Sequence, residues 1–160
     1  NRCYHKGKRR IPMKTKCLAF TAAVFAALGM IVGIVYHGMM LSTGTGGTAM
    51  AATHPMTFAL GCGGFLIALV LEKLFAVSES KLAKPAYFVY IVGVAMTVIM
   101  LIVRGYFQMS GTELTSGADA AISGIAGIGH TVLAVGMALF FVALFRRIFA
   151  AEKPSDKGAE

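Results

Sequence analysis

Residues 120–145 read AAISGIAGIGHTVLAVGMALFFVALF and contain no acidic, lysine or arginine side chain. An α-helix rises 1.5 Å per residue, so about 20 apolar residues already cross the hydrocarbon core of a bilayer. This stretch is therefore long enough for a membrane-spanning helix. Strict alternation of apolar and polar residues is absent, which disfavours a β-barrel, the other structure that satisfies backbone groups in lipid.

Three further uncharged apolar stretches precede this one, at residues 17–36, 56–71 and 85–103. The shortest reaches spanning length once residues 51–55 are included. Of the 160 residues, 57% are apolar and 14% charged, and the mean hydropathy is +0.73, which excludes a water-soluble globular domain. The sequence thus predicts an all-α integral membrane bundle of four helices in up-down-up-down order. The predicted helices cover about residues 17–41, 53–76, 84–108 and 116–149.

The basic residues are segregated along the chain. Of fifteen Lys and Arg residues, seven precede residue 17, three lie at 73–84 and four follow residue 145. The positive-inside rule then places both termini and the 73–84 loop in the cytoplasm of a bacterial cell, as in a multi-pass protein of the cytoplasmic (inner) membrane. This topology accounts for the net charge of +8, so we expect no nucleic-acid partner. The predicted parts are a basic tail at 1–16, the transmembrane domain at 17–149 and a second tail at 150–160.

Several residues indicate helix ends and helix packing. Pro55 and Pro85 are typical of the first turn of a helix, and Thr53 or His54 is the expected capping residue before Pro55. Residues 116–119, with Ser first and Asp last, have the spacing of a capping box. Small residues four apart, such as Gly29 with Gly33 and Ser123 with Gly127, are typical of close contact between membrane helices.

Four ionisable residues lie at membrane depth: His37, His54, Arg104 and His130. Counted from the basic end of each helix, they lie about 31, 27, 30 and 24 Å along it, so we expect one layer in the outer third of the bilayer. An ionisable group in the membrane is costly and indicates a functional site. Arg104 is expected to be buried against a polar partner or a ligand anion rather than lipid.

His130 is the deepest of the four and has small neighbours on its own helical face. Positions i−7, i−3 and i+4 are Ser123, Gly127 and Ala134, which leave room beside the imidazole for a neighbouring helix or a flat ligand. His54 is likewise followed by two small residues, Gly61 and Cys62.

The second and fourth helices of such a bundle stand on a diagonal of roughly 13 Å, given interaxial spacings of 8 to 10 Å between neighbours. This separation suits two histidines that clasp one haem b from both faces. We therefore predict His54 and His130 as axial ligands, with Arg104 beside a propionate and His37 at the periphery of the site. A six-coordinate low-spin haem would suit electron transfer, sensing or haem handling.

Two alternatives use the same residues. The histidines together with methionines could bind Cu(I), although no methionine motif stands out. Alternatively, the chain is a structural or transport module without a cofactor, and it could assemble as a homo-oligomer. A redox role would need a redox partner, and the sequence contains no nucleotide-binding or hydrolytic motif. The candidate methionines are Met39, Met40, Met50, Met56 and Met109.

Four runs of residues together resemble a known family. They are Thr-His-Pro at 53–55, LVLEK at 69–73, VIMLIVRG at 98–105 and GADAAISGIAGIGH at 117–130. The chain is similar over about residues 13–148 to a bacterial four-helix membrane family catalogued as domain of unknown function 2871. The resemblance implies the fold and the membrane location but no reaction.

The chain departs from that family at two places. The family's second helix opens with a His-Thr-His pattern, and here Ala52 stands at the first histidine and leaves His54. The first helix of the family usually ends with Arg where this chain has His37. The second departure favours His54 and His130, rather than His37, as the central pair, and it argues against a metal site of three histidines.

Overall fold

The computed structural model describes residues 13–152 and contains only helices within that range. The predicted tails fall mainly on residues 1–12 and 153–160, which lie outside the described residues. The elements are α1 (Met13–Thr43), α2 (Ala49–Met56), the π-helix η1 (Thr57–Gly63), α3 (Gly64–Phe75), the 3-10 helix η2 (Val77–Glu79), α4 (Ala83–Ser110) and α5 (Ser116–Glu152).

Four helical segments of this range are long and apolar enough to cross a membrane. They are Thr15–Thr43, Ala49–Phe75, Ala83–Ser110 and Ser116–Ala150. The second combines α2, η1 and α3 into one span. The predicted four-helix architecture is therefore confirmed, and the chain is a multi-pass membrane protein.

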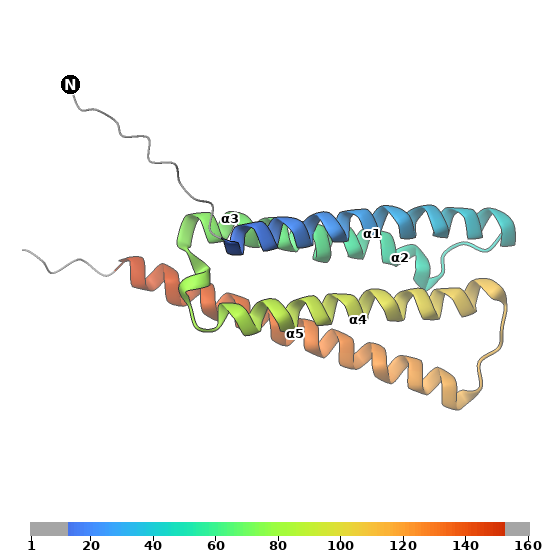
Figure 1. Cartoon of the computed structure of the whole chain (residues 1–160). Coiled ribbons are helices and arrows are strands. Elements are labelled where there is room, and N and C mark those ends of the chain that lie inside the picture. Colours follow the sequence, from blue (N-terminus) through green and yellow to red (C-terminus); the bar gives the residue numbers. More distant parts are fainter. Residues whose placement is uncertain (1–12, 153–160) are drawn as a thin grey trace, which may run out of the picture.

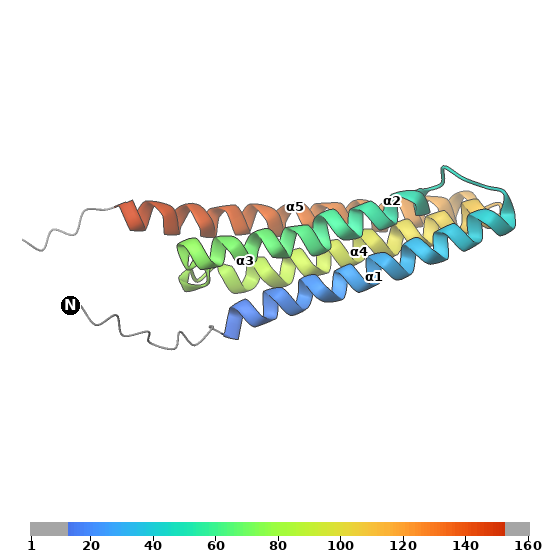
Figure 2. The same ribbon diagram turned by 90° about the horizontal axis from the view of Figure 1, so that it is seen from above.

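The helices run antiparallel to one another along the chain (Figures 1 and 2). The start of α1, the turn that contains η2 and the end of α5 lie together at one end, which we call the basic end (Figure 1). The loops 44–48 and 111–115 lie at the opposite, neutral end. The side of the membrane that each end faces remains a prediction.

The bundle is tighter between some helices than between others. The chief pairings are α1 with α2, η1 and α3, and α4 with α5 and α2. Among the described residues, α5 meets α3 near the basic end but has no comparable packing against α2 or α1. Figure 1 shows α5 diverging from α1 and α2 toward the neutral end. One face of α5 is consequently left open in that half.

Glycines set the close approach of α4 and α5. A β-carbon at Gly93 would collide with the backbone of Leu133, and one at Gly136 would collide with the backbone of Tyr90. Leu133 and Val94 continue this contact into the core, where they join Phe25 and Phe65. Because lipid is as apolar as these side chains, close van der Waals packing rather than the hydrophobic effect holds such helices together.

The second span begins earlier than predicted. We expected Pro55 at its start, but α2 begins at Ala49 and Pro55 lies inside it. A proline in a helix interior removes one backbone donor, which membrane helices tolerate when local backbone adjustments compensate. The π-helix η1 follows immediately after Met56. The predicted caps at Thr53 and His54 are therefore wrong.

The other predicted helix starts are closer to the structure. Pro85 lies in the first turn of α4, where a missing backbone donor has no cost. α5 begins at Ser116, but the cap is Thr115, whose Oγ1 accepts a hydrogen bond of 3.3 Å from the Ala118 backbone N–H. The predicted capping box at residues 116–119 is therefore wrong, and Asp119 forms a different interaction.

Candidate functional site

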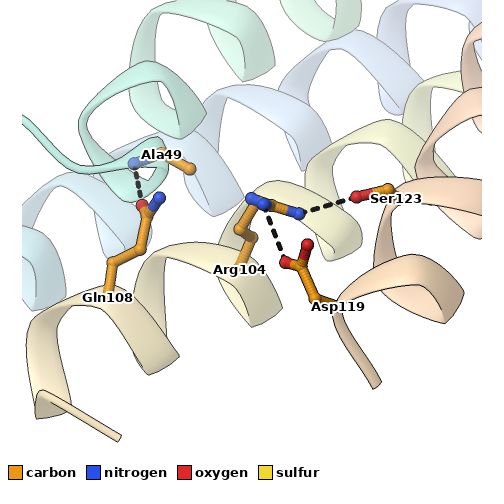
Figure 3. A network of polar contacts seen from close by, with 5 residues as sticks. All are labelled: Ala49, Arg104, Gln108, Asp119 and Ser123. Atoms are coloured by element: carbon orange, nitrogen blue, oxygen red, sulfur yellow. Dashed lines mark hydrogen bonds and ion pairs between the residues drawn. The ribbon is translucent and has the colours of Figure 1, made fainter. Parts of the chain in front are cut away.

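Arg104 of α4 joins α5 through two hydrogen bonds at the neutral end (Figure 3). Its Nη2 donates to Asp119 Oδ1 at 2.9 Å, which is also an ion pair, and its Nη1 donates to Ser123 Oγ at 2.9 Å. The predicted polar partner of Arg104 is confirmed. Because the Arg104 and Asp119 side chains are 36% and 49% exposed, this pair is only partly shielded.

One turn farther along α4, Gln108 caps the second span. Its Oε1 accepts a hydrogen bond of 2.7 Å from the Ala49 backbone N–H, the first donor of α2 (Figure 3). Arg104 and Gln108 are four residues apart and share one face of α4. We call the group Arg104, Gln108, Asp119 and Ser123 the neutral-end cluster, since it links α4 to both α2 and α5.

His54 is held between α2 and α1. Its Nδ1 lies 2.8 Å from the carbonyl oxygen of Gly29, and its ring meets Phe58 edge-on with centroids 4.9 Å apart. A β-carbon at Gly33 would lie 2.6 Å from the same Nδ1. The expected closeness at Gly29 and Gly33 is thus confirmed, because it makes room for the side chains of His54 and Phe58.

His130 lies in the middle of α5 and is exposed. Its Nδ1 lies 3.0 Å from the carbonyl oxygen of Ala126, one turn earlier in the same helix. A carbonyl oxygen only accepts hydrogen bonds, so Nδ1 is the donor here and at His54. In the neutral imidazole, both Nε2 atoms then carry a free lone pair, which is the form that binds metals.

The surface around His130 is made of small, exposed residues. We define the His130 face of α5 as Ser123, Gly127, His130 and Ala134, all of which are exposed. A β-carbon built on Gly127 would have no neighbour within 4 Å. The room that the sequence predicts beside His130 is therefore present, and none of the other described helices fills it.

The small residues predicted beside His54 are used differently. A β-carbon at Gly61 would lie 2.5 Å from the ring of Phe25, so α1 fills that space. His54 thus faces α1, whereas His130 lies on α5, and the described residues show no contact between the two. Ligation of one haem by both histidines stays a prediction.

The predicted polar layer is more spread along the bundle than expected. Gly129 packs against Met96, which lies eight residues, or about 12 Å, from Arg104 along α4. His37 is exposed one turn beyond Gly33, toward the neutral end. The structure unites Arg104 with α5, but it leaves His37, His54 and His130 in separate surroundings.

The positions of the methionines do not favour a Cu(I) site. Met50 and Met109 are 4% and 3% exposed and lie in the interior of the bundle, where Met50 packs on Gly105. Within residues 13–152, no group of three or more His, Cys, Asp and Glu side chains is arranged to hold a metal ion. A haem needs only one or two such side chains.

Three members of the neutral-end cluster are not among the predicted site residues: Gln108, Asp119 and Ser123. Gln108 follows Arg104 by four residues, which puts both on one helical face and was a usable signal. Asp119 was assigned to the helix cap. It is one of two acidic residues between 105 and 149, so it was the natural candidate to pair with Arg104.

Comparison with known proteins supports the predicted family. A family model described as "Protein of unknown function (DUF2871)" matches residues 14–147, which is most of the chain. Searches of curated proteins and of solved structures found no match. The chain belongs to the DUF2871 family.

Proposed function

We propose that this protein binds haem b on the His130 face of α5 and serves electron transfer, sensing or haem handling in the membrane. The observation that carries the proposal is the hydrogen bond from His130 Nδ1 to the Ala126 carbonyl. Such a bond fixes the ring and leaves Nε2 free to bind iron. Because the acceptor belongs to the same helix turn, this orientation does not depend on a neighbouring helix.

The surroundings of His130 fit a flat, largely apolar group. Gly127 and Ala134 flank the imidazole with small side chains, and both are exposed. A polar side chain that faces lipid at this depth is costly, so a ligand that covers it would be favoured. Haem also needs a partner for its propionates at one edge.

Arg104 is suitably placed for that role. It bonds Ser123, which lies seven residues, or about 10 Å, from His130 along α5. A guanidinium has five N–H donors, and the contacts with Asp119 and Ser123 use two of them. Donors therefore remain for a carboxylate.

His54 is retained as the proposed second axial ligand only because the sequence predicts it. The hydrogen bond of its Nδ1 to the Gly29 carbonyl holds the ring against α1, and this bond would have to break for the ring to reach a haem on α5. We therefore expect His130 to be essential and His54 to contribute less. Copper is the weaker alternative, since Met50 and Met109 are packed inside the bundle.

The test is the absorption spectrum of the detergent-purified protein after expression with ample haem. We expect the narrow, split bands of a low-spin haem in the reduced wild type and their loss in His130→Ala. Thr131→Ala is the matched control, since Thr131 is the next residue, is exposed and bonds its own helix at Gly127. A colourless wild-type protein would contradict the proposal and favour a structural or transport module without a cofactor.

We further propose that the basic end faces the cytoplasm of a bacterial inner membrane, because basic residues of the described segments gather at that end. They are Lys14, Lys16, Lys73, Lys81, Lys84, Arg146 and Arg147. Cysteine labelling tests this orientation in a background with the native cysteines replaced. Thr45→Cys should react with an impermeant reagent added outside the cell, and Ser80→Cys should not. The reverse pattern would overturn the orientation.

A further inference from the structure

A cavity of about 730 Å³ opens at the basic end of the bundle, and no residue of the His130 face lines it. It is bounded by the start of α1, by α3, by the first half of α4 and by α5. The residues that line it fall into two groups. The deep part is aromatic, and the mouth is formed by the turn between α3 and α4.

The deep wall offers rings rather than polar atoms. Phe65 meets Tyr87 and Tyr90 edge-on, with centroid distances of 5.6 and 5.3 Å. Both tyrosine hydroxyls are already used: that of Tyr87 is 2.7 Å from Thr21 Oγ1, and that of Tyr90 donates to the Leu60 carbonyl at 2.9 Å. The wall therefore suits a hydrocarbon chain.

The mouth carries a net positive charge. Lys81 and Lys84 both line the cavity and are exposed, and neither forms an ion pair within the described part of the chain. Of the two carboxylates nearby, Glu79 is neutralised by an ion pair of 2.6 Å with Arg147. Glu72 accepts a hydrogen bond of 2.7 Å from the Ser78 backbone N–H, a neutral donor, so its charge offsets one of the two lysines.

The start of α4 adds to this field. The first turn of α4 contains no acidic residue, so the positive end of its dipole lies beside Lys84 without a compensating side chain. An anion at this mouth would meet two ammonium groups and a helix N-terminus together.

We propose that this cavity is a binding site for an anionic phospholipid. One acyl chain lies along the wall of Phe65, Tyr87 and Tyr90, and the phosphate lies at Lys81 and Lys84. The match is between a molecule with an apolar tail and an anionic head, and a cavity with an apolar depth and a cationic mouth at the membrane surface.

A second cavity differs from the proposed lipid site in having no charged residues. It has a volume of about 450 Å³, lies between α1 and α4 and has no charged residue in its lining. Phe20 is on its wall and is 72% exposed. Lipid that fills this hollow should show no headgroup preference.

The chain contains no tryptophan, so a single introduced tryptophan reports lipid contact through quenching by brominated acyl chains. Phe141→Trp places the reporter at the proposed site, because Phe141 lines the cavity, and Phe20→Trp is its control. The protein is reconstituted in vesicles that contain brominated phosphatidylglycerol or brominated phosphatidylcholine as a minor component. We expect phosphatidylglycerol to quench the Phe141→Trp protein at a concentration about tenfold lower or more, and both lipids to quench the Phe20→Trp protein alike.

The charged mouth is tested in the Phe141→Trp background. Lys81→Gln with Lys84→Gln should abolish the preference, whereas Lys73→Gln, which removes a lysine of the same region that does not line the cavity, should preserve it. Soluble glycerol phosphate should not displace the brominated lipid. The proposal is overturned if both lipids quench equally, if Lys73→Gln matters as much as the double variant, or if glycerol phosphate alone competes.

Discussion

His54 and His130 both lie beside glycines, but the two regions use that space in opposite ways. At the α1–α2 contact, the space above Gly29 and Gly33 is filled by Phe58 and His54. On α5, Gly127 beside His130 has open space. Small residues at helical spacing therefore predict room, and only the neighbouring helix decides whether that room is a packing contact or an unoccupied face.

The largest expected effect is on stability and comes from filling the two regions with the same side chain. Gly33→Leu must expel the His54 ring and break its hydrogen bond to Gly29, so we expect a loss of about 3 kcal/mol in the free energy of unfolding. Gly127→Leu should cost less than about 0.5 kcal/mol, since nothing lies above it. Denaturation in mixed detergent micelles measures both. Equal losses would break the comparison.

The Gly127→Leu variant also distinguishes an effect on haem binding from an effect on stability. Gly127→Leu should abolish haem binding by covering the His130 face although the fold is intact. If Gly127→Leu protein binds haem like the wild type, the His130 face is not the site.

A smaller effect is expected at the neutral-end cluster, which anchors the open part of α5 to α4. Asp119→Ala leaves Arg104 with Ser123 as its partner, and we expect a loss of about 1 kcal/mol because the ion pair is half-exposed. The neutral pair Arg104→Gln with Asp119→Asn should recover part of this loss. Thermal unfolding of the three variants checks this. A double variant that is less stable than Asp119→Ala would show that the pairing is not what Asp119 contributes.

A comparable or smaller loss should follow from removing the cap that positions α2. Gln108→Leu deprives the Ala49 N–H of its acceptor and should cost about 1 kcal/mol. Gln108→Glu keeps an acceptor oxygen and should be close to wild type. Helix content by circular dichroism, together with unfolding, distinguishes the two. An equal loss in both variants would mean that the amide donors of Gln108 matter instead.

The smallest expected effect is at Gly124, on the open part of α5. A β-carbon there has no neighbour within 4 Å, so Gly124→Ala should raise stability by less than about 1 kcal/mol through helix propensity. Gly29→Ala is the matched variant in the filled region and should lower it, because its β-carbon would lie 2.7 Å from Phe58. Opposite signs sharpen the comparison, and a loss at Gly124 would indicate that this face is packed.

The spans were predictable because each is an uncharged apolar run with a basic cluster at one end. This pattern can be recognised in one helix without knowledge of its neighbours. The start of the second span was not predictable, because the side chain that caps it belongs to Gln108, which lies 59 residues after Ala49. The environment of His54 likewise depends on the register of α2 against α1, which no single-helix pattern contains.

The room predicted beside His130 is confirmed, because it depends on neighbours within α5 itself. The close helix contact expected at Ser123 and Gly127 is wrong for Gly127, whose β-carbon would have no neighbour within 4 Å.

The pairing of Arg104 lies between these cases. A charged residue at membrane depth requires a polar partner, which the sequence indicates. The sequence limits an acidic partner to Glu113 or Asp119. The choice between them, and the contact with Ser123, depend on how far α5 is shifted along α4.

The most direct test of the account is the haem-to-protein ratio of the purified wild type and of three alanine variants at His37, His54 and His130. The account predicts a ratio near the wild-type value for His37→Ala, a reduced ratio for His54→Ala and almost none for His130→Ala. A normal ratio in His130→Ala with full loss in His54→Ala would contradict it and would place the site at the α1–α2 contact.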